Sequence, residues 1–123
     1  MIKNIVRDPL VEKALLEDGF IIAKNFVPRE AIQRLADFYD EVRPHDELEK
    51  FHFYATTFSQ NIEFRKRVKA KIVEEIDPSI QKLFFDYKHL GGNFILKVPS
   101  KSSDLIVHQD TDLTDEKLYP PTN

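Results

Sequence analysis

The hydrophobic pattern of this 123-residue chain changes its period once, at Gly91-Gly92. Before this pair, apolar residues recur every three or four positions, which indicates amphipathic helices. After it, Phe94, Leu96 and Val98 occupy alternate positions and share one face of an expected strand. The sequence therefore predicts an α+β fold in a single domain. Residues 1–90 form a mainly helical region with short strands, and residues 91–123 supply the first strands of the core.

Several segments before the break carry helix-start and helix-stop signals. The first expected helix runs from about Pro9 to Asp18, between an N-capping aspartate and a glycine. The second begins at Pro28 and is stopped by Pro44. The third begins near Gln60, and Asp77-Pro78 is expected to end it and to start a separate short helix.

Four segments have the composition of strands or extended chain. The run Phe20–Ala23 is short, apolar and bounded by turn residues, so we interpret it as a strand buried on both faces. Phe51–Phe58 is rich in aromatic and β-branched residues and is expected to be extended. Asn93–Val98 and Leu105–Asp110 are joined by a turn-rich connection, so we expect these two strands to pair or to lie adjacent.

Composition excludes several classes of function. The formal net charge of -3 argues against nucleic acid or an anionic membrane as the main partner. The basic run Arg65–Lys71 is interpreted as a solvated helix face. The chain contains no cysteine, so thiolate catalysis and sulfur-ligated metal centres are excluded. No apolar run has the length of a signal peptide or a membrane span, and we expect a cytoplasmic protein.

His108 and Asp110 are the candidate metal ligands. They follow the apolar residues Leu105-Ile106-Val107, and side chains two positions apart on a strand point to the same face. An imidazole and a carboxylate are two thirds of the 2-His-1-carboxylate set that holds non-haem Fe(II). A polar strand face or a buried charge pair is the alternative interpretation.

Other residues are candidates for the rest of such a site. His45, His52 and His89 are the remaining histidines, and no neighbouring pattern marks any of them as the third ligand. Lys97 lies on the predicted strand among apolar residues, where its ammonium would meet the carboxylate of a small acid. A lysine in this setting more commonly extends to solvent.

Two blocks of the sequence resemble the phytanoyl-CoA dioxygenase family. Glu17–Ile22 followed by Asn25–Pro28 is similar to the opening of that family's domain. Gly92–Pro99, then Leu105–Asp110, then Leu113–Glu116 resemble its metal-binding core in order and spacing. Together the blocks extend over nearly all of the chain from about Leu16 onward.

The resemblance implies an Fe(II)- and 2-oxoglutarate-dependent oxygenase acting on a small-molecule substrate. It implies a double-stranded β-helix of the jelly-roll type, with the N-terminal helices packed outside. His108 and Asp110 match the first two iron ligands, and Lys97 matches a position near 2-oxoglutarate in some relatives.

The family's second iron-binding histidine and its 2-oxoglutarate-binding arginine lie beyond the region of resemblance, and no arginine follows Arg67. We therefore expect residues 1–123 to be a partial oxygenase domain, the N-terminal half of a truncated enzyme. Part of a jelly roll would leave unpaired strand edges that favour self-association. Two alternatives stay open: a non-catalytic truncated relative that serves as a structural or interaction module, and a metallohydrolase using His108 and Asp110.

Overall fold

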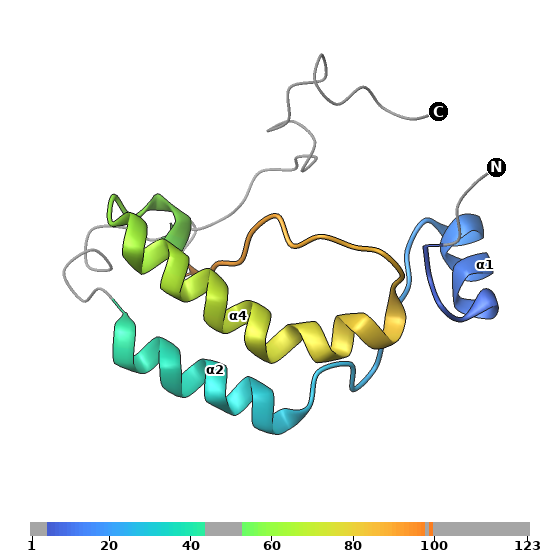
Figure 1. The fold of residues 1–123 in the computed structure, drawn as a ribbon, viewed down its shortest axis with the longest axis horizontal. Helices are drawn as coiled ribbons and strands as arrows, with labels where there is room; N and C mark the ends of the chain where they lie inside the picture. Colours follow the sequence, from blue (N-terminus) through green and yellow to red (C-terminus); the bar gives the residue numbers. More distant parts are fainter. Residues whose placement is uncertain (1–4, 44–52, 98, 100–123) are drawn as a thin grey trace, which may run out of the picture.

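Two helices lying side by side and a small sheet are the main packed elements of the described chain (Figure 1). The structure, a computed structural model, describes residues 5–43, 53–97 and 99. Its elements are the helices α1 (Pro9–Asp18), α2 (Arg29–Val42) and α4 (Ile62–Leu83), the strands β1 (Phe53–Ala55) and β2 (Ile95–Lys97), and the 3-10 turn η1 (Thr56–Phe58). This mixture of helix and sheet confirms the α+β class in general terms.

Helix α1 has the bounds that the sequence predicts, because both of its ends are capped locally. The Asp8 carboxylate accepts a hydrogen bond from the Leu10 amide at 2.8 Å. Gly19 adopts a left-handed conformation with φ 77°, and its amide donates to the Leu15 carbonyl at 2.9 Å. These two caps confirm the predicted helix from Pro9 to Asp18.

Helix α2 confirms the second predicted helix. Pro28 is its N-cap, and the helix ends at Val42, shortly before the proline that was expected to stop it. Ala31 and Leu35 are buried on its inner face. Phe38 and Tyr39 are half-buried and pack against Phe94, with ring centroids 6.4 and 5.1 Å apart, so the aromatic residues of this helix border the core.

Helix α4 corrects the prediction of two separate helices, because it continues through Pro78. A proline inside a helix removes one backbone hydrogen bond and costs about 3 kcal/mol. Contacts of the helix with the rest of the chain oppose this loss, since Glu75, which is 6% exposed, is paired with Arg34 on α2, and Ser79 is 2% exposed. The helix begins at an Asn61 cap, whose side chain accepts from the Phe64 amide at 3.0 Å.

The expected buried strand at Phe20–Ala23 is wrong. The segment has no strand conformation, and Phe20 and Ile22 are 62% and 78% exposed. It forms part of the connection from α1 to α2, and no strand among the described residues pairs with it (Figure 1). A short apolar run becomes a buried strand only when a partner strand is available.

The two strands pair in antiparallel fashion, with Tyr54 opposite Leu96. This arrangement confirms extended chain in part of Phe51–Phe58 and a strand within Asn93–Val98. The pair is extended by two bonds, from the Thr56 amide to the Phe94 carbonyl and from the Phe94 amide to the Thr56 hydroxyl, both 3.0 Å long. The expected pairing of Asn93–Val98 with Leu105–Asp110 lies outside the described residues.

The segment after α4 runs back along that helix to reach β2 (Figure 1). The Lys69 ammonium donates to the Leu90 carbonyl at 3.2 Å, and Gly92 lies against Ile72.

At the other end of α4, Val6 forms a bridge with Phe84 and is 1% exposed. The segment after α4 therefore lies along the helix, and the N-terminal segment pairs with the residue that follows it.

Candidate functional site

The residues predicted to bind iron lie outside the part of the chain that the structure describes. His108 and Asp110 are among these, as are the third-ligand candidates His45 and His52. Their roles stay predictions. Within residues 5–43 and 53–97, no group of three His, Asp or Glu side chains is arranged to hold a metal ion.

Lys97 lies at the end of β2, opposite Phe53 on β1, and its side chain is exposed. It does not line either cavity described below. This position suits a side chain that extends to solvent, and it also leaves the ammonium accessible to a carboxylate.

His89 belongs to a polar cluster centred on Asp77. One carboxylate oxygen of Asp77 accepts a hydrogen bond from the Tyr87 hydroxyl at 2.6 Å and also contacts Nε2 of His89. Gln81, one turn further along α4, donates to the other oxygen. The His89 ring packs edge-on against Tyr87, with centroids 5.2 Å apart. The cluster fastens the segment after α4 to the helix, so a structural role explains His89.

The electrostatics of this cluster follow from its hydrogen bonds and its burial. The contact with His89, followed by the bond from Tyr87, holds the pKa of Asp77 below its usual value. Burial, followed by the bond to Asp77, raises the pKa of the Tyr87 phenol. Asp77 is therefore an ionised acceptor at neutral pH, and Tyr87 is a neutral donor.

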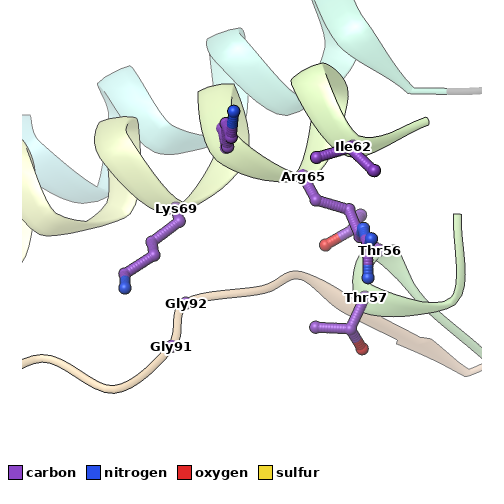
Figure 2. A pocket seen from close by; sticks show the side chains of 8 residues that line it. Thr56, Thr57, Ile62, Arg65, Lys69, Gly91 and Gly92 are labelled. Carbon is purple, nitrogen blue, oxygen red and sulfur yellow. The ribbon is translucent and has the colours of Figure 1, made fainter. Parts of the chain in front are cut away.

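A basic cavity lies between the start of α4, the turn η1 and the Gly91-Gly92 segment (Figure 2). Its volume is about 230 Å³. It is lined by Thr56, Thr57, Ile62, Arg65, Lys66, Lys69, Gly91 and Gly92. This described lining holds three cationic side chains and no carboxylate, so the cavity suits an anionic group.

Sequence reasoning assigned the cations of this cavity to a solvated helix face and did not single out its other members. The spacing of Arg65 and Lys69 puts them on one face of the helix, which was visible in the sequence. The sequence did not show that Thr56 and Gly91 lie close to these cations, because their position depends on contacts between residues more than twenty positions apart.

A second, apolar cavity of about 490 Å³ lies between α1, the connection that follows it and the end of α4. Its lining includes Leu10, Phe20 and Ile22, each of which is more than half exposed. These exposed apolar side chains form a hydrophobic surface patch beside α1.

Comparison of the chain with protein-family models, with curated proteins and with solved structures finds no significant match. Within residues 5–43 and 53–97, no helix combines the length and apolar character needed to cross a bilayer.

Proposed function

We propose that the chain belongs to a cytoplasmic Fe(II)- and 2-oxoglutarate-dependent dioxygenase of the phytanoyl-CoA dioxygenase type, which hydroxylates a small molecule. The observation that carries this proposal is the ordered motif around His108-Gln109-Asp110, which follows an apolar strand sequence. The strand at Ile95–Lys97 supports it, because the segment that precedes the motif is extended and paired in a sheet. The jelly-roll core and the limits of the oxygenase domain belong to the same proposal.

The donor chemistry of His108 and Asp110 fits Fe(II), which accepts one imidazole and one carboxylate among its protein ligands. His89 is the histidine in the described part of the chain, and its Nε2 already contacts Asp77, so it is not proposed as the third ligand. When bound, iron and 2-oxoglutarate would supply the oxidising chemistry. The protein's share would be to hold the metal through His108 and Asp110. The Lys97 ammonium would bind a carboxylate of the cosubstrate.

The proposal is tested on a version of the chain extended past Asn123, by anaerobic titration with Fe(II) followed by measurement of succinate formed from 2-oxoglutarate in air. We expect His108→Ala and Asp110→Ala each to weaken iron binding by roughly tenfold or more and to abolish succinate formation. His89→Gln is the matched control, because it removes a histidine outside the motif that is already in contact with Asp77. If iron binding and succinate formation are unchanged in both motif variants, His108 and Asp110 are not the iron ligands.

A non-catalytic structural or interaction module is the second candidate. It is favoured by the small described sheet, in which β1 and β2 have only each other as partners among the described residues, and by the exposure of Ile95 at 59%. Open strand edges of this kind allow pairing with a second chain. A purified chain that forms a stable oligomer without iron would favour this candidate, whereas stoichiometric iron would favour the oxygenase.

A further inference from the structure

The basic run Arg65–Lys71 is divided by the structure into cations with different partners. Arg67 donates to Glu41 at 2.7 Å and lies over the Phe38 ring, so it links α4 to α2. Lys71 pairs with Glu75 at 2.7 Å and with Glu74 at 3.2 Å. These contacts neutralise one side of the helix.

The opposite side of the run faces the basic cavity. Figure 2 shows the Arg65 side chain extending toward Thr56 and Thr57, and the Lys69 side chain extending toward Gly91 and Gly92. No described carboxylate forms an ion pair with Arg65 or Lys69, whereas Lys66 is paired with Glu63 at 2.9 Å. Lys69 has a single hydrogen bond, to the Leu90 carbonyl, which leaves two of its three donor protons.

We propose that this cavity is a binding site for a phosphate group, held by Arg65 and Lys69. Guanidinium and ammonium donors make short, charge-assisted hydrogen bonds to phosphate oxygens, and arginine can make two in parallel. Thr57 lies exposed at the rim and turns its hydroxyl away from the cavity (Figure 2). The buried Thr56 hydroxyl accepts from the Phe94 amide, so its own proton is free for another acceptor.

The size of the cavity limits what enters it. Ligand pockets for whole drug-sized molecules have volumes of about 300–1,000 Å³. The 230 Å³ found here accommodates one phosphate group with its solvent, so either free phosphate or the phosphate ester of a larger molecule fits. The site goes beyond the proposed oxygenase function, because its described lining does not include Lys97 or any histidine.

Titration of the isotopically labelled full chain with inorganic phosphate, followed by two-dimensional amide NMR at constant ionic strength, tests the proposal. The pH is kept near neutral, where phosphate carries more than one negative charge. We expect saturable shifts at the amides of Thr56, Thr57, Gly91 and Gly92. Arg65→Gln should weaken binding roughly tenfold, because it removes the bidentate donor.

Arg67→Gln is the matched control, since it removes the same charge two residues along the same helix but outside the cavity. We expect it to change the affinity by less than about twofold. Gly91→Val is a second test that keeps every charge. A Cβ at Gly91 meets nothing within 4 Å, so the chain should accommodate the valine, and the added bulk on a residue that lines the cavity should weaken binding.

A parallel titration with glycerol 3-phosphate distinguishes the source of the group. Tighter binding of the ester supports a site for the phosphate of a larger molecule, and tighter binding of inorganic phosphate supports a site for the free anion. Equal losses in Arg65→Gln and Arg67→Gln would overturn the proposal, as would shifts that follow ionic strength without saturating. Either result would mean that the cations attract only a diffuse counterion atmosphere.

Discussion

Arg34 on α2 holds both carboxylate oxygens of Glu75 on α4. Its Nε lies 3.0 and 2.9 Å from the two oxygens, and its Nη2 lies 2.7 Å from Oε2. The Glu75 side chain is only 5% exposed, and its Oε1 also forms an ion pair with the Lys71 ammonium at 2.7 Å. This two-point pair joins the two helices through a buried carboxylate and an arginine side chain that is 56% exposed.

The same pair makes stability depend on pH. The bonds from Arg34 and then Lys71 lower the pKa of Glu75 from 4.5 to about 2. The unfolded chain therefore binds more protons between these values, and the stabilisation present above pH 4.5 is lost as the pH falls toward 2. We expect Glu75→Gln to be less stable at neutral pH and to show a shallower loss between pH 4.5 and 2, measured by urea unfolding. An unchanged slope would show that the pair does not link folding to protonation.

The neighbouring glycines Gly91 and Gly92 should respond differently to alanine. A Cβ on Gly92 would meet Ile72 side-chain atoms at 3.3 and 3.4 Å, whereas one on Gly91 would meet nothing within 4 Å. Both substitutions reduce the entropy of the unfolded chain by a similar amount, so the comparison isolates the contact. We expect Gly92→Ala to be less stable than Gly91→Ala by roughly 1 kcal/mol in thermal or urea unfolding. Equal stabilities would mean that the segment moves away from Ile72 at no cost.

The phenol of Tyr87 should report on its bond to Asp77. Burial and this bond raise the pKa of the phenol. Asp77→Asn keeps the shape of the side chain and removes its charge, so the pKa of Tyr87 should fall in an ultraviolet titration. Tyr87→Phe identifies which of the four tyrosine transitions belongs to this residue. A transition that stays in place in Asp77→Asn would assign the raised pKa to burial alone.

Self-association through the sheet can be tested at Ile95, which is 59% exposed on β2. We expect Ile95→Lys to weaken any oligomer several-fold in light scattering, because a charge on a strand edge opposes further pairing. Ile32→Lys is the control, since Ile32 is 49% exposed and belongs to α2, not to a strand. Equal effects of the two lysines would indicate general apolar association.

Local signals predicted most of the helical framework. The bounds of α1 follow from the side chain of Asp8 and the conformation of Gly19, both of which act within four residues. The same reasoning located the beginning and end of α2. It failed at Pro78, where α4 continues through the local signal for a break and is held against α2 by the pair between Arg34 and Glu75.

The candidate sites were predicted less completely. The interpretation of His108 and Asp110 rests on sequence and resemblance, and both residues lie outside the described chain. For the basic cavity, the sequence shows that Arg65 and Lys69 share a helix face, but not that Thr56 and Gly91 lie opposite them. That approach depends on where the segment after α4 is fastened, through Asp77, Tyr87 and the backbone of Leu90.

The order of residues alone therefore determined where helices begin, where the pattern changes to strands and which residue types are available for chemistry. Those features depend on neighbours within about one turn of helix or one pair of strand positions. Contacts between distant segments decided that Phe20 and Ile22 stay exposed, that β2 pairs with β1, and that the cations of one basic run have different neighbours. A short apolar run or a lone cation has several possible partners, and only packing against the rest of the chain selects one of them.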